Sequence, residues 1–158
     1  MTKDIHLYES GSGGELNIVN NDIQLVETLF QQVYLCLFGG NVEASTKGNE
    51  LSGEVRNDWW GNSLLFSEQP QKQFNSETER VINETVLNSS GRIKIQRAVE
   101  SDLSFFGNTA KSEVVVTILN HDSVQVFVKL TRLIDQQEIN LKIIWDNAKN
   151  EVIIQKTI

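Results

Sequence analysis

The feature that most constrains the fold is the strand pattern of the C-terminal third of the chain. Apolar-rich segments occupy residues 114–119, 124–133, 139–145 and 151–156, and short polar turns separate them. Turns of this length join neighbouring antiparallel strands. In the second segment apolar residues alternate with polar ones, as expected of a sheet that is covered on one face only. The sequence therefore predicts a C-terminal antiparallel sheet with one buried face.

Upstream of this sheet, helical spacing of apolar residues predicts helices. The first covers residues 27–38 and ends at Gly39 and Gly40. The second opens with the capping-box pattern of Ser76 and Glu79 and continues to about residue 88.

A third helix is expected over residues 92–106, because Gly91 and the two serines before it interrupt the pattern. Asp102 lies beside the apolar stripe of this helix and needs a partner if it is buried. The stripe consists of Ile95, Ala98, Val99, Leu103 and Phe106.

The N-terminal region is predicted to be a β-hairpin. Residues 15–19 and 22–26 alternate apolar and polar side chains around Asn20 and Asn21. Asparagine tolerates positive φ, so this pair can close a two-residue turn. Ile5 and Leu7 indicate a further short strand.

The chain of 158 residues is long enough for one hydrophobic core. We expect residues 1–158 to form a single α+β domain: an N-terminal β-hairpin, about three helices and a C-terminal antiparallel sheet. Residues 41–75 show no sustained period, and irregular segments of this length are usually functional or contact a partner.

The charge of the chain argues against several classes of function. There are 14 Lys and Arg against 21 Asp and Glu, which gives a net charge of −7. Nucleic-acid binders and polybasic membrane-surface proteins need clustered cations, so neither partner is expected. No apolar run resembles a signal peptide or a bilayer span, and we expect a soluble protein made in the cytosol.

The residues that could carry chemistry are few. Cys36 is the single cysteine, which excludes an internal disulfide framework, and its apolar surroundings indicate a small buried side chain. His6 and His121 lack partners at metal-ligand spacing. The glycines at 11–14 lack the spacing of a phosphate-binding loop. We expect no cofactor, no metal and no catalytic residues.

One enzymatic alternative stays open. Glu43, Glu54 and Asp58 lie in the irregular segment, where a cleft could form, and a glycan hydrolase needs only two carboxylates. A soluble protein-binding module unrelated to any tail is a further alternative.

The order of elements, together with the sequence Asp58, Trp59, Trp60 and Gly61, resembles the Mu-like phage tail baseplate protein family. That family is related to the baseplate wedge proteins, or sheath initiators, of contractile tails. The resemblance covers roughly residues 14–133. The Glu-Pro-Arg motif that wedge proteins often carry after their last helix is absent from this sequence, and residues 139–158 look like a C-terminal hairpin extension.

The resemblance implies a non-enzymatic baseplate component that links wedge and hub proteins to the first sheath ring. Its expected partners are other wedge and hub proteins and the tail sheath protein, with several copies around a ring. Its expected location is the baseplate of a virion tail or tail-like particle, assembled in the bacterial cytoplasm.

Two segments are candidate protein interfaces. The first is the aromatic loop, because tryptophan is enriched at interface hot spots, although both rings could equally cap the core. The second is the C-terminal strand, a plausible sheet edge that could pair with another chain. The candidate interface residues are Asp58, Trp59, Trp60, Leu64, Val152, Ile153 and Ile154.

Overall fold

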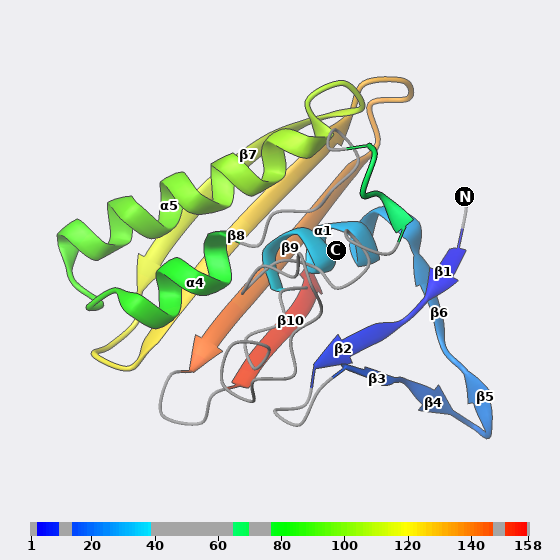
Figure 1. The fold of residues 1–158 in the computed structure, drawn as a ribbon, viewed down its shortest axis with the longest axis horizontal. Coiled ribbons are helices and arrows are strands. Elements are labelled where there is room, and N and C mark those ends of the chain that lie inside the picture. The colour runs from blue at the N-terminus through cyan, green and yellow to red at the C-terminus, as the bar shows by residue number, and fades with distance from the viewer. Residues whose placement is uncertain (1–2, 10–13, 39–64, 70–76, 147–150, 158) are drawn as a thin grey trace.

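The computed structural model describes residues 3–9, 14–38, 65–69, 77–146 and 151–157. It has the predicted α+β architecture (Figure 1). The N-terminal strands are β1 (Lys3–Ile5), β2 (Leu7–Glu9), β3 (Gly14–Leu16), β4 (Ile18–Val19), β5 (Asp22–Ile23) and β6 (Leu25–Glu27). The helices are α1 (Thr28–Phe38), α4 (Glu77–Glu84), α5 (Ser89–Leu103) and the short 3₁₀ helix η2 (Ser104–Phe106). The C-terminal strands are β7 (Ala110–Ile118), β8 (Ser123–Arg132), β9 (Glu138–Asp146) and β10 (Glu151–Thr157).

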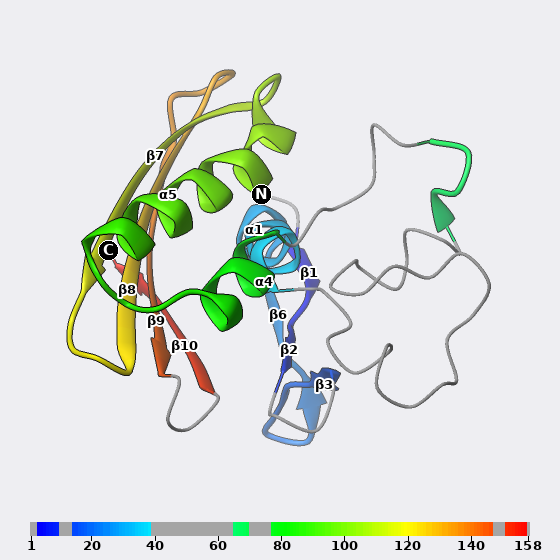
Figure 2. The same ribbon diagram turned by 60° about the vertical axis from the view of Figure 1, so that its left-hand side comes forward.

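The predicted antiparallel sheet is confirmed. It has four strands in the order β10-β9-β8-β7, and every neighbouring pair is antiparallel. The helices lie on one face of this sheet, with α5 running along it and α1 and α4 beside α5 (Figure 2). Each strand begins or ends within a few residues of its predicted bounds, because period-2 alternation is a strong local signal.

The alternation along β8 and β9 separates the core from the outer face. The helix-facing residues are fully buried, and their neighbours are only half-buried. Register places the buried sets opposite each other, with Val128 opposite Leu141 and Val126 opposite Ile143. The buried set is Val124, Val126, Val128, Leu130, Ile139, Leu141, Ile143 and Trp145. Strand β9, part of the 139–158 segment, is therefore an interior strand that contributes to the core.

Helix α1 forms where the sequence predicts it and is buried over most of its circumference, including Cys36. Helix α4 ends at Glu84, four residues earlier than expected. Val86, two residues beyond the end of the helix, is 75% exposed.

The prediction that residues 89–91 break the helical pattern is wrong, because they form the first turn of α5. Asn88 is the N-cap, and its Oδ1 accepts the N–H of Gly91 at 2.9 Å. Gly91 does not interrupt the helix; a glycine is needed here because the backbone of Val86 leaves no room for a side chain. A Cβ at this position would lie 2.1 Å from the carbonyl oxygen of Val86. The predicted apolar stripe of α5 is buried throughout.

The N-terminal hairpin is confirmed only around its turn. Asn20 and Asn21 both have positive φ, 53° and 63°, as a type I′ turn requires. Strands β4 and β5 pair over Ile18 and Val19 alone, and beyond them the two arms separate and pair with other strands.

Candidate interaction surfaces

The N-terminal strands form a three-way junction. We call residues 3–9 and 14–27 the N-terminal lobe. The lobe consists of three chain segments, residues 3–9 with β1 and β2, residues 14–19 with β3 and β4, and residues 22–27 with β5 and β6. Each segment pairs with both others, since β1 pairs with β6, β2 with β3, and β4 with β5. The segments meet at His6, Asn17 and Gln24, which separate the two strands of each segment. The backbones of these three residues form a closed ring of hydrogen bonds. His6 N–H donates to the Gln24 carbonyl, Gln24 N–H to the Asn17 carbonyl, and Asn17 N–H to the His6 carbonyl, at 2.8–3.1 Å.

The side chains of the same three residues also converge. The Nδ1 atom of His6 lies 3.1 Å from both Gln24 Oε1 and Asn17 Nδ2. Asn17 Nδ2 also donates to Gln24 Oε1. The centre of the N-terminal lobe is therefore a polar cluster whose hydrogen bonds replace a hydrophobic core of its own.

A buried glutamine fixes this lobe to α1. Gln31 is 1% exposed. Its side-chain amide bonds to both the N–H and the C=O of Leu7, as the backbone of a neighbouring strand does in a sheet. The Oε1 atom accepts the Leu7 N–H at 3.1 Å, and Nε2 donates to the Leu7 carbonyl at 3.0 Å. His6 adds an edge-on contact to the Phe30 ring, with centroids 6.0 Å apart. These contacts set the position of the lobe relative to the helices.

In the N-terminal lobe polar side chains lie inside and apolar side chains outside, the reverse of an ordinary hairpin. Each segment carries an apolar–polar–apolar triplet, and the central His6, Asn17 or Gln24 is more buried than most of its apolar neighbours. Six apolar side chains are consequently exposed, the most open being Ile18 at 65%. Exposed apolar side chains gathered on one small lobe are typical of an interaction surface. They are Ile5, Leu16, Ile18, Val19, Ile23 and Leu25.

The sheet offers a second surface at its β10 edge. Strand β10 pairs with β9 on one side, and no strand in the described ranges pairs with its other side. Register places Val152 opposite the buried Trp145 and Ile154 opposite the buried Ile143. Ile153 is opposite Ile144, which is only half-buried. Of the three β10 residues predicted as interface residues, Val152 and Ile154 are therefore in register with the buried face of β9. Ile153 is in register with its half-buried outer face.

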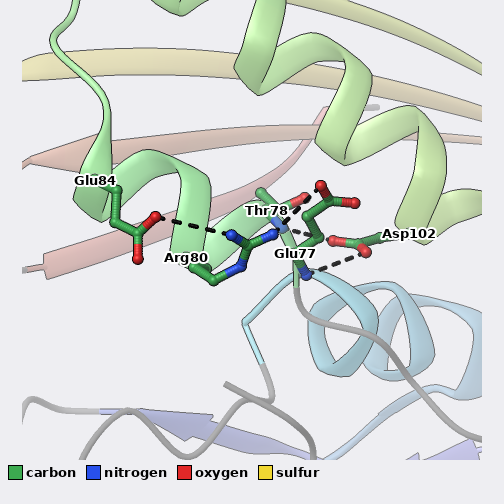
Figure 3. A network of polar contacts seen from close by, with 5 residues as sticks. All are labelled: Glu77, Thr78, Arg80, Glu84 and Asp102. Atoms are coloured by element: carbon green, nitrogen blue, oxygen red, sulfur yellow. Dashed lines mark hydrogen bonds and ion pairs between the residues drawn. The ribbon is translucent and has the colours of Figure 1, made fainter. Parts of the chain in front are cut away.

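Asp102 has the partner that its position requires. It is 4% exposed, and its carboxylate accepts the N–H of Glu77 at 3.2 Å and of Thr78 at 2.8 Å (Figure 3). These are free donors of the first turn of α4, so a side chain of α5 caps α4. Burial raises the pKa of Asp102 to about 7, although the N–H bonds from Thr78 and Glu77 oppose this shift.

Beside this cap, Arg80 lies between two glutamates. Its guanidinium is 3.5 Å from Glu77 and 3.8 Å from Glu84 (Figure 3). Glu79, one half of the predicted capping box, is 5% exposed. Ser76, the other half of the predicted capping box, lies outside the described residues.

The remaining polar features do not assemble a catalytic group in the described part of the chain. Burial raises the pKa of the Cys36 thiol far above its ordinary value, so the thiol stays protonated. His121 is in the β7–β8 turn, and its side chain is 87% exposed. Its Nε2 atom is 2.6 Å from Oδ2 of Asp122. Within the described ranges, no three His, Cys, Asp or Glu side chains gather as metal ligands.

One open cavity of about 670 Å³ lies between the start of α1 and the β8–β9 turn. Its lining includes Glu27, Gln32, Arg132 and Asp135, and the last two form an ion pair at 3.5 Å. The guanidinium is therefore already neutralised by a neighbouring carboxylate, which leaves this cavity without an evident ligand charge to recognise.

Several sequence-predicted site residues lie outside the described residues. Asp58, Trp59, Trp60 and Leu64 are among them, as are Glu43 and Glu54 of the hydrolase alternative. Gln31 and the polar cluster were not among the residues predicted from the sequence. The repeated apolar–polar–apolar triplet was the available signal, but period-2 alternation alone does not say which face is buried.

Among the helices that the structure describes, none has the length and apolar character needed to cross a membrane. Comparison with known proteins found no matching family model, no matching curated protein and no matching solved structure.

Proposed function

We propose that this protein is a structural assembly component that joins other proteins through its surfaces. The more specific role is that of a baseplate component in a contractile phage tail or tail-like injection system, where it links wedge or hub proteins to the first sheath ring. The specific role rests on the sequence resemblance around Asp58, Trp59 and Trp60. The general role rests on the surfaces of the fold.

The observation that carries the general role is the position of β10 at the edge of the four-stranded sheet. An edge strand presents backbone N–H and C=O groups that an incoming strand can pair with. A partner that adds a strand here would extend the sheet beyond β10. Repetition around a ring would give avidity to contacts that are weak individually.

A charge placed on the edge tests this role. We expect Ile153→Lys to fold, because Ile153 is in register with the half-buried Ile144. A lysine on an edge strand opposes strand addition. The matched control is Ile144→Lys, which makes the same change on β9, an interior strand that already has two neighbours.

The measurement is recovery of partners by the tagged wild type and both variants from cells that produce the native system, followed by mass spectrometry. Wild type and Ile144→Lys should recover tube, sheath or spike proteins, and Ile153→Lys should lose at least one of them. Recovery of none of these proteins by wild type would contradict the baseplate role. Glycan turnover lost on Glu43→Gln, Glu54→Gln or Asp58→Asn would support the hydrolase instead.

A further inference from the structure

The N-terminal lobe combines exposed apolar side chains with a strong excess of negative charge. Residues 3–27 contain five acidic residues and one lysine. Asp4 and Asp22 are exposed, and each carboxylate accepts the N–H of the residue that follows it. A partner for this surface must therefore supply apolar contact and positive charge together, since like charges at an interface disfavour association.

The opposite character is found in a groove between α4 and α5. The groove has a volume of about 510 Å³, and Arg80, Lys94 and Arg97 line it with Glu77 and Glu84. Both glutamates are paired with Arg80. Lys94 and Arg97 are exposed and form no ion pair with any residue that the structure describes. The lining of the groove therefore carries a small excess of positive charge, three cations against two carboxylates, on an acidic protein.

Two exposed apolar residues are next in sequence to residues that line this groove. Val86 follows the lining residue Thr85 and is 75% exposed, and Ile93 precedes Lys94 and is also exposed. The groove and its neighbouring residues therefore offer both kinds of contact that a partner of the N-terminal lobe must supply.

Helix α1 lies between α4 and the strands of the N-terminal lobe in Figure 1, and it contacts both of them. Gln31 and His6 hold the lobe against α1, so the lobe does not fold back onto the groove of its own chain. Contact between the two surfaces requires two molecules.

We propose that the N-terminal lobe of one copy docks into the α4–α5 groove of a second copy. Asp4 and Asp22 face Lys94 and Arg97 across this contact, and the exposed isoleucine and valine side chains of both surfaces are buried in it. Because the two surfaces differ, the contact is head-to-tail. Such a contact closes into a ring or continues as an open chain, depending on its rotation.

Charge reversal tests the pairing. A lobe variant, Asp4→Lys with Asp22→Lys, and a groove variant, Lys94→Glu with Arg97→Glu, should each weaken self-association by about tenfold or more. A chain carrying all four substitutions restores opposite charges and should regain association. The matched controls are Glu113→Lys and Lys111→Glu, which reverse exposed charges of one ion pair on β7.

The measurement is sedimentation velocity of the purified full chain over a range of concentrations, at low and at high salt, with circular dichroism to confirm folding. We expect the wild-type mass to increase with concentration and the increase to shrink at high salt, since salt screens exposed charges. The proposal is overturned if wild type stays monomeric at roughly 1 mM in low salt, a concentration at which even weak complexes form. It is also overturned if the lobe variant or the groove variant associates as the controls do.

This contact uses surfaces other than β10, so its failure is distinguishable from failure of the proposed function. Monomeric wild type that still recovers tail proteins through β10 would refute self-docking alone. Self-association without recovery of tail proteins would leave self-docking and remove the baseplate role.

Discussion

At the scale of single residues, buried polar side chains decide how the elements meet. Asp102 brings the first turn of α4 to α5, and Gln31 brings Leu7 to α1. In each case a side chain satisfies backbone groups of a segment more than twenty positions away in the chain. Such contacts specify one arrangement, because leaving either partner unpaired and buried is costly.

The Asp102 cap predicts a pH dependence of stability. The pKa of Asp102 is raised by burial to about 7, from 3.8 in an exposed chain. Between these two values the folded protein holds a proton that the unfolded chain has released, so the free energy of unfolding falls as pH rises through this window. The slope from this group is up to about 1.4 kcal/mol per pH unit.

Urea unfolding between pH 4 and 8 measures this effect. The variant Asp102→Asn cannot ionise, so the difference in unfolding free energy between wild type and variant should shrink or reverse as pH rises to about 7. Parallel pH profiles for the two proteins would show that Asp102 is ionised throughout this range in the folded state.

At the scale of elements, the contacts between the N-terminal lobe and α1 include the Gln31 hydrogen bonds and the packing of His6 on Phe30. The core of the lobe is the polar cluster of His6, Asn17 and Gln24, and its apolar side chains are largely exposed. A lobe of this kind gains little stability from apolar burial, so its hydrogen bonds to α1 carry much of its attachment.

Removal of the glutamine anchor should therefore loosen the lobe alone. Gln31→Ala leaves the N–H and C=O of Leu7 without their partner, at a cost of roughly 1–3 kcal/mol. Amide hydrogen exchange should speed up in residues 3–9 and 14–27, whereas β8 and β9 keep their protection. The control is Gln32→Ala on the same helix, which should leave exchange in the lobe unchanged.

At the scale of the whole molecule, one apolar cluster connects α1, α4, α5 and the sheet. Strand β9 contributes four buried residues to this cluster although it belongs to the segment that looked like an extension in sequence. The charge is unevenly distributed over the same molecule, with acidic residues in the lobe and the exposed cations Lys94 and Arg97 in the α4–α5 groove. The apolar cluster therefore accounts for the fold, and the charge distribution accounts for the proposed self-docking.

If β9 is integral to this core, truncating one of its side chains should destabilise the whole protein. Leu141 is 1% exposed, so Leu141→Ala should cost about 2–5 kcal/mol in unfolding free energy. The neighbouring Lys142→Ala, on the half-buried face, should cost far less. Thermal unfolding followed by circular dichroism compares them. Equal melting temperatures for the two variants would mean that β9 is dispensable.

The parts of the fold that depend on local periodicity could be predicted from the amino-acid sequence. The four C-terminal strands, the first helix and the Asn20–Asn21 turn follow from alternation, helical spacing and the tolerance of asparagine for positive φ. The buried stripe of α5 follows from the same kind of pattern.

Three features depend on contacts between residues far apart in the chain: which face of the lobe is buried, which backbone N–H groups donate to Asp102, and which strands lie at the edges of the sheet. The N-terminal triplets read as an ordinary hairpin, yet their polar centres turn inward because three segments meet there and exchange hydrogen bonds. Periodicity records the alternation of side chains but not the partner that each face meets. That partner is set by residues far apart in the chain, such as Leu7 and Gln31, and no local pattern specifies such a contact.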